Sequence, residues 1–369
     1  MVICFECSVD TKHQIDELLR SGRYTTVSEL MAVAVSNQVL LQTHADREGA
    51  VLFDDARRPT AASEVRSPED QLAGPQDTAP AVDPSKRWDN GVSALFTNRP
   101  AAPTGPIAEL SRDPAIDGPE IVPPSLWIFG QYNRLLPAKA SCRALANLLV
   151  DARGIDPAAA AKKIAGEAAE LGNHLRILDR RYERGRDDMF CTAFPGLADP
   201  DKGRLRYANQ FVVSVDNQER LSGLLYDLKL INRVPGREPR ISLTDAGWKF
   251  ALLENPVLDS KQEAEVRERL SAEERHLLVA HISSSVPRER SAYQVILSAI
   301  SHGKNTPDSI SKAMKALERS GPANDSLIAT QRSGAISRMS DLALLSRDRD
   351  GIRVQYNLSD DGNRFLRGR

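Results

Sequence analysis

Two segments in the C-terminal half of this 369-residue chain repeat one pattern of residues. The sequence DLKLINR at 227–233 aligns with DLALLSR at 341–347, and LTDAG at 243–247 aligns with LSDDG at 358–362. Each copy predicts an apolar helix end, a strand ending in arginine, a polar turn, a second strand, and a Thr or Ser that caps a last helix. The duplication constrains the fold, because both copies must form the same local structure.

The two segments, 220–253 and 335–366, resemble the recognition helix and wing of winged-helix DNA-binding domains. Upstream of the second copy, Ser271 and Thr306 are each placed to cap a helix. In the first copy, the recognition helix is expected to begin at Asp216 or Asn217. Its core stripe would consist of Leu221, Leu224, Leu225 and Leu228.

The resemblance implies that the start of each recognition helix reaches base edges and that the wing contacts the phosphate backbone. In the first copy the implied DNA-binding residues are Asn217, Gln218, Arg220 and Ser222 on the helix, and Arg233, Arg237 and Arg240 on the wing. In the second copy they are Arg332, Ser333, Ser337 and Arg338 on the helix, and Arg347, Arg349 and Arg353 on the wing. Acidic neighbours such as Asp348 dilute the wing charge, so a protein-binding role for either copy stays open.

The N-terminus predicts a strand over 2–9, a helix that ends at Gly22, and a second helix that begins at Thr25 or Thr26. A unit this small buries too little apolar surface to be stable alone, so it is expected to pair with a second copy. The pattern resembles the ribbon–helix–helix family of dimeric repressors and antitoxins.

That resemblance implies a phosphate contact at Thr25, Thr26 and Ser28, where a helix begins. It places Cys4 and Glu6 on the strand face that enters the major groove. The implied dimer interface contains Ile3, Phe5, Leu30 and Ala34. Glu6 departs from the family pattern, since an acidic side chain would meet a polyanion. A dimerisation module without DNA contact therefore remains the alternative.

We expect a mainly α protein with short β elements, a ribbon–helix–helix followed by tandem winged helix-turn-helix domains. The expected domains are 1–46, a flexible linker over 47–124 rich in Pro, Ala, Asp, Ser and Gly, a first winged-helix domain with a helical extension over 125–258, and a second over 259–369. Trp88, Leu95 and Phe96 could dock on a folded surface or belong to the linker. A protein partner could bind the linker.

A formal net charge of −1 excludes a strongly basic coat protein, so any DNA surface must be local. Four scattered cysteines suit a reducing cytoplasm, and neither a signal peptide nor a membrane-length apolar run is visible. Cys4-x-x-Cys7 has metal-pair spacing, but alternate strand positions point to opposite faces and no second pair follows. We expect no metal and no cofactor.

The sequence thus predicts a cytoplasmic, homodimeric, non-enzymatic protein that binds specific double-stranded DNA, most simply a transcriptional regulator. One alternative is a non-catalytic DNA-recruiting or scaffold subunit of a plasmid-maintenance, mobile-element or defence complex. Another is an antitoxin-like binder whose linker folds on a toxin. The last is an enzyme with an unrecognised site in residues 125–215.

Overall fold

A computed structural model describes residues 16, 92–103, 107–110, 121–150, 152–196, 199–236, 238–259, 266–318, 324–350 and 353–368. The chain divides into two compact units, Met1–Ala79 and Pro80–Arg369. The first unit is described only at Asp16. The predictions for Ile3, Cys4, Phe5, Glu6, Thr25, Thr26, Ser28, Leu30 and Ala34 therefore lie outside the described residues, as does Arg237 of the second unit.

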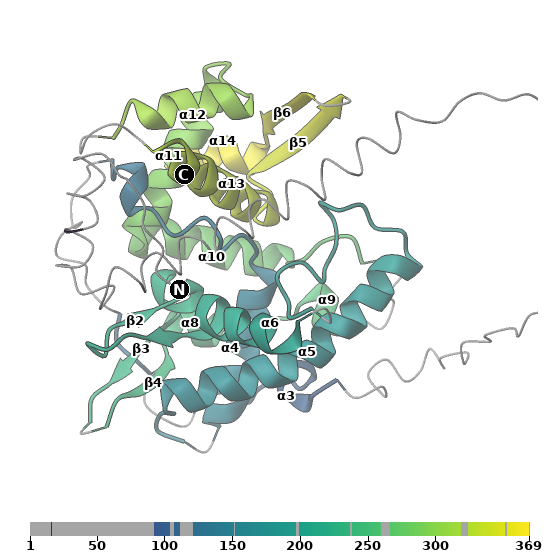
Figure 1. Ribbon diagram of the computed structural model, residues 1–369, viewed down its shortest axis with the longest axis vertical. Coiled ribbons are helices and arrows are strands. Elements are labelled where there is room, and N and C mark those ends of the chain that lie inside the picture. The colour runs from purple at the N-terminus through teal and green to yellow at the C-terminus, as the bar shows by residue number, and fades with distance from the viewer. Residues whose placement is uncertain are drawn as a thin grey trace, which may run out of the picture. The chain divides into compact units, whose positions relative to one another are not determined.

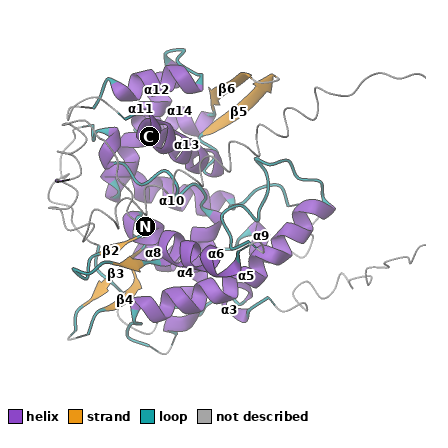
Figure 2. Ribbon diagram, viewed as in Figure 1, coloured by secondary structure: helices purple, strands orange, loops and turns teal. Residues whose placement is uncertain are grey.

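The described part of the second unit is mainly helical with small antiparallel sheets, which confirms the expected coarse fold class (Figure 2). Its helices are α3 (Ala94–Thr97), α4 (Leu136–Leu149), α5 (Pro157–Arg181), α6 (Pro200–Tyr207), α7 (Leu224–Asp227), α8 (Asp245–Leu252), α9 (Pro256–Asp259), α10 (Ala272–Ser285), α11 (Pro287–Ser301), α12 (Pro307–Lys315), α13 (Asp325–Asp341) and α14 (Asp360–Leu366). A 3-10 turn covers Pro124–Leu126 and a π-helical turn covers Ala208–Val212. The strands are β1 (Ser214–Val215), β2 (Leu221–Ser222), β3 (Ile231–Val234), β4 (Arg240–Leu243), β5 (Leu345–Asp350) and β6 (Arg353–Leu358).

The predicted duplication is present as two hairpins, β3–β4 and β5–β6, each followed by a capped helix. Thr244 caps α8 and Ser359 caps α14, as the sequence predicts. Each cap hydroxyl also donates to the main chain before its hairpin, Thr244 to the Lys229 carbonyl at 2.8 Å and Ser359 to the Ala343 carbonyl at 2.6 Å. Lys229 and Ala343 both adopt a positive φ, 55° and 57°, so the two helix ends share one left-handed C-terminal turn.

The glycine of each LxDxG motif lets the last helix approach the end of the preceding one. A Cβ atom at Gly247 would lie 2.0 Å from the Leu230 carbonyl oxygen, and one at Gly362 would lie 2.1 Å from that of Leu344. No side chain fits such a distance to the main chain. The motif therefore records a packing requirement that both copies share.

The duplication extends upstream of the segments that the sequence aligns. Ile155 forms an antiparallel bridge with Ile241 of β4, with N–H···O distances of 3.0 and 2.9 Å. At the corresponding place in β6, the Tyr356 N–H donates to the Asn305 carbonyl at 2.9 Å. In both copies the next residue caps a helix and is followed by proline, at the starts of α5 and α12. We therefore define the first copy as 136–252 and the second copy as 287–366, coloured teal to green and green to yellow in Figure 1.

The copies differ in the segment just before the β3–β4 or β5–β6 hairpin, where the second copy has its third helix. The second copy has α13, with 17 residues, whereas the first copy has α6, the π-helical turn, the β1–β2 hairpin and the four-residue α7. The prediction that a recognition helix begins at Asp216 or Asn217 is therefore wrong. The leucines of the predicted stripe are nevertheless all buried, because burial alone does not distinguish a strand from a helix.

Local hydrogen bonds explain why a helix does not form there. The Asp216 carboxylate accepts from the main-chain N–H groups of Gln218 and Arg220, both at 2.8 Å, which stabilises a turn instead of a helix. Glu219 and Gly223 adopt positive φ values of 60° and 112°. A right-handed helix cannot pass through either position.

The two copies share one hydrophobic core across the expected boundary between 258 and 259. Lys139 of α4 forms an ion pair with Glu274 of α10, at 2.7 Å, and both side chains are fully buried. The Lys139 ammonium also donates to the carbonyls of Phe250 and Leu253, at 2.5 and 2.6 Å. The Pro80–Arg369 unit is thus held together by a buried polar network as well as by apolar packing.

Part of the expected flexible linker is packed on this unit. Phe96 of α3 is fully buried, and Asn147 of α4 donates to the Leu95 carbonyl at 2.9 Å. The Ala108 N–H donates to the Leu243 carbonyl at 3.0 Å. Among the described residues before 125, the expectation of a free linker therefore does not hold, since apolar burial and main-chain hydrogen bonds both hold this segment on the unit. Within the described residues, no helix is long and apolar enough to cross a membrane.

Candidate nucleic-acid interface

Two sides of α13 are covered by the rest of the unit. Ile328, Ala335 and Met339 are buried in the core that α13 shares with α11 and α12. A second side lies against the segment before α4, where a Cβ atom at Gly334 would be only 2.1 Å from the Gly130 carbonyl oxygen. The close contact of the two glycines fixes α13 firmly in the unit.

The remaining side of α13 is open and lined by serines. Ser326, Ser333 and Ser340 are exposed, and Ser337 between them is half-buried. Two of the four predicted DNA-binding residues on this helix, Ser333 and Ser337, therefore lie on one accessible face. Small hydroxyl side chains let another molecule approach the helix closely and can donate or accept a hydrogen bond.

The two predicted arginines of α13 have structural partners instead. Arg338 is completely buried, and its Nε and Nη2 donate to both carboxylate oxygens of Glu289 in α11 at 2.5 and 2.9 Å. Its Nη1 donates to the Tyr132 carbonyl at 2.6 Å. The expectation that Arg338 faces outward is therefore wrong. Arg332 is half-buried and donates to the carbonyl of Pro307 at 3.0 Å.

The β5–β6 hairpin carries its charges on two separate faces. Side chains alternate along a strand, so Arg347 and Arg349 share one face of β5 while Asp348 and Asp350 share the other. Arg353 of β6 is the cross-strand partner of Asp350 and so lies on the acidic face. The sequence shows an alternating, nearly neutral wing, but the strand separates it into a basic face and a mixed face.

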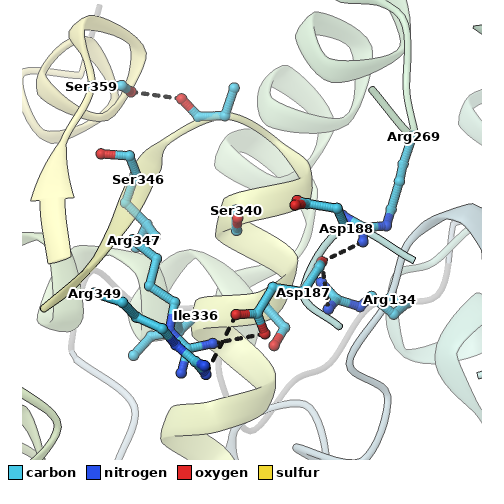
Figure 3. A pocket seen from close by; sticks show the side chains of 13 residues that line it. Arg134, Asp187, Asp188, Arg269, Ile336, Ser340, Ser346, Arg347, Arg349 and Ser359 are labelled. Carbon is cyan, nitrogen blue, oxygen red and sulfur yellow. Dashed lines mark hydrogen bonds and ion pairs between the residues drawn. The ribbon is translucent and has the colours of Figure 1, made fainter. Parts of the chain in front are cut away.

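The basic face meets a loop from the first copy (Figure 3). The carboxylate of Asp187, which follows α5, accepts from Arg347 at 2.9 Å and lies 3.4 Å from Arg349. Its main-chain carbonyl accepts from Arg134 and Arg269, at 3.3 and 2.5 Å. Four guanidinium groups from distant parts of the chain thus converge on one aspartate.

Arg134 and Arg269 are also tied to the end of α13. Both reach Oδ1 of Asp341, at 3.3 and 3.2 Å, and the Leu135 N–H donates to Oδ2 at 2.9 Å. The Asp341 side chain is fully buried. Burial lowers the pKa of Arg134, and the neighbouring positive charge of Arg269 acts in the same direction, while Asp341 opposes both.

These groups surround a pocket of about 570 Å³ between α13, β5 and the loop after α5. Its lining consists of Arg134, Asp187, Asp188, Arg269, Ile336, Ser337, Ser340, Ala343, Leu345, Ser346, Arg347, Arg349 and Ser359. Four arginines therefore face two aspartates in the lining. The pocket is the place where the open face of α13 and the basic face of the hairpin meet.

The predicted DNA-binding residues of the first copy lie elsewhere, on or after the β1–β2 hairpin. Asn217, Gln218, Arg220 and Ser222 are all exposed. The Arg220 guanidinium forms an ion pair with Asp216 at 2.7 Å, within its own turn. These residues share no helix face, so the arrangement that the sequence predicts for them is absent.

The β3–β4 arginines of the first copy are also paired with acids. Arg233 lies 3.6 Å from Glu219, and Arg240 lies 3.0 Å from Glu238. These pairs reduce the positive charge that this hairpin offers to an anion. Among its described residues, the first copy thus has no helix comparable to α13 directly before its hairpin, and Arg233 and Arg240 are each paired with an acid of the same copy.

The described residues offer little for metal or nucleophile chemistry. They contain no group of three His, Cys, Asp or Glu side chains that could hold a metal ion. Burial raises the pKa of the Cys142 thiol to about 12, which keeps it protonated and unreactive. His281 is buried and hydrogen-bonded to the Leu228 carbonyl at 2.8 Å, a packing role.

Comparisons of the chain with protein-family models, with curated proteins and with solved structures found no match.

Proposed function

We propose that the protein binds double-stranded DNA and that the second copy, 287–366, acts as a winged helix that supplies the DNA-binding surface. One observation carries the proposal: the open serine face of α13 and the arginine face of the β5–β6 hairpin lie beside each other at one pocket. A third helix beside a basic hairpin is the arrangement by which winged helices dock a helix in the major groove and a wing on the backbone.

In this proposal the open face of α13 reads bases and the hairpin contacts phosphates. Ser326 and Ser333 would hydrogen-bond to base edges, which serine does with little base preference. Arg347 and Arg349 would contact phosphate oxygens. Because the whole chain has a net charge of −1, a single copy would bind weakly.

Dimerisation would compensate for the weak single contact. We propose that residues 1–46, within the Met1–Ala79 unit, pair as a ribbon–helix–helix homodimer and place two copies of the chain on a two-fold-related DNA site. Linking binding modules in this way raises the effective affinity without any new contact. A cytoplasmic transcriptional regulator is the simplest protein with this organisation.

The first copy favours a second candidate, a DNA-recruiting or scaffold subunit of a larger assembly. The exposed β1–β2 hairpin takes the place of a third helix. Arg220, Arg233 and Arg240 are each paired with an acid of the same copy, whereas Arg347 and Arg349 of the second copy share one carboxylate. Such a surface suits a protein partner better than a polyanion. Stoichiometric co-purification of a second protein, lost when the β1–β2 turn is replaced by Asn-Gly, would favour this candidate.

The test of DNA binding starts with selection of genomic and random fragments on the full chain, followed by fluorescence anisotropy of the enriched duplex. Ser333→Glu places a negative charge on the open face of α13 and should weaken binding by roughly tenfold or more. Ser301→Glu makes the same change at an exposed position at the end of α11 and should leave binding unchanged. Failure to enrich any sequence, or equal effects of the two variants, would refute the proposed surface.

A further inference from the structure

We propose that the pocket between α13, β5 and the loop after α5 binds a small ligand that carries phosphate, and that the phosphate displaces the Asp187 carboxylate from Arg347 and Arg349. The proposal goes beyond DNA binding and does not depend on it. It assigns a ligand class to a cavity whose residues come from four separate parts of the sequence.

The charges of the lining favour an anion. The lining contains four arginines and two aspartates, and Asp341 behind it pairs with Arg134 and Arg269, so four positive charges meet three negative ones. Arg347 and Arg349 converge on a single carboxylate, at 2.9 and 3.4 Å. A phosphate group has more acceptor oxygens and more charge than this carboxylate, and guanidinium forks match its geometry.

Two of the arginines have donors without an acceptor. The Nε atoms of Arg134 and Arg269 are buried and find no hydrogen-bond partner among the described residues. The two side chains are only 12% and 11% exposed. A buried donor without a partner is costly, so both side chains are held in the pocket lining with incomplete hydrogen bonding.

The size of the pocket favours a small molecule over a duplex. Its volume of about 570 Å³ lies within the range of roughly 300–1,000 Å³ typical of small-molecule sites. Ser337 and Ser340 line the wall formed by α13 and can donate hydrogen bonds to further oxygens of the ligand. The pocket therefore combines charge, hydroxyl donors and volume suited to a phosphorylated small molecule.

Pyrophosphate is a suitable probe, because it carries the proposed chemistry and is small enough for the pocket. Isothermal titration into the full chain at low salt should give a saturable site. Arg349→Ala removes a pocket arginine that pairs with the Asp187 carboxylate and should weaken binding by roughly tenfold. Arg353→Ala removes the same charge from the opposite face of the same hairpin and should leave binding unchanged.

Asp187 provides the decisive variant. Asp187→Asn removes the competing negative charge and should tighten pyrophosphate binding several-fold. Asp348→Asn makes the same change on the outer face of β5 and should have no effect. If Asp187 serves only to hold the hairpin, its replacement will leave the affinity unchanged or weaker, which overturns the proposal.

A second arm titrates a short duplex into the same variants. Equal losses of pyrophosphate affinity in Arg349→Ala and Arg353→Ala would mean that pyrophosphate binds through general surface charge, and the proposal fails. If Asp187→Asn tightens the duplex but not pyrophosphate, the arginines serve the DNA backbone and the small-ligand site is overturned. If pyrophosphate behaves as expected and no duplex binds, the proposed DNA function fails while the ligand site stands.

Discussion

Arg338 offers the sharpest prediction, because its sequence pattern and its position in the structure imply different roles. As a base-reading residue it would be dispensable for folding. In the structure its guanidinium forms a two-point pair with Glu289, and both side chains are fully buried. Arg338→Met would retain the length of the side chain but remove the charge.

The expected loss follows from what the substitution leaves behind. Glu289 would become a buried carboxylate without its partner, which costs about 3–5 kcal/mol of unfolding free energy. The Tyr132 carbonyl would also lose its donor, now at 2.6 Å. The double variant Arg338→Met with Glu289→Leu removes both charges and should recover most of the loss, to within about 2 kcal/mol of the original chain.

The assay is urea unfolding of the full chain, followed by tryptophan fluorescence and circular dichroism, for the two single variants and the double. The non-additivity of the three values measures the coupling of the pair. A loss below about 1 kcal/mol for Arg338→Met, or a double variant as unstable as the sum of the single variants, would refute the buried-pair argument. Unchanged stability together with weaker DNA binding would restore the base-reading role.

Three further predictions concern one buried charge and two backbone positions. Burial raises the pKa of Asp227 to about 6. The folded state therefore holds the carboxyl proton more tightly than the unfolded state does. The stability that this group contributes falls as pH rises from about 4 to about 6. Asp227→Asn should therefore stabilise the protein by up to about 3 kcal/mol at pH 7.5 and have little effect near pH 4, and an equal gain at both pH values in urea unfolding would contradict this. Gly166→Ala, in the middle of α5 with no atom within 4 Å of the added Cβ, should stabilise by about 0.5–1 kcal/mol. Gly334→Ala should strongly lower the melting temperature, because the Cβ would lie 2.1 Å from the Gly130 carbonyl oxygen; similar melting temperatures for the two alanine variants would show that this contact is not tight.

Helix starts were predictable because a cap acts over three or four residues. Ser271 and Thr306 cap α10 and α12 in the expected places, each with a reciprocal hydrogen bond from the third residue of the helix. The apolar residues of α5 recur at helical spacing, and Ile164 and Leu175 among them are both fully buried. The same spacing failed after Asp216, where side-chain hydrogen bonds to the main chain favour a hairpin.

The candidate site was only partly accessible to sequence reasoning. Ser333, Arg347 and Arg349 are accessible as predicted, whereas Arg338 is buried. Asp187 was missed, because nothing in the residues around it indicates a partner 160 positions away in the chain. The sequence around an exposed aspartate looks the same whether its carboxylate faces solvent or pairs with a distant arginine.

The sequence by itself determined the local elements of this protein: the duplicated motif, its helix caps, its two hairpins and the glycines that let the last helices approach. Each depends on hydrogen bonds and sterics within a few residues, so the local sequence is sufficient. Only the tertiary structure decided that Arg338 is a core residue and that four arginines surround Asp187. Those outcomes depend on which distant segments pack together, because the burial and pairing of a charge are properties of its neighbours in space.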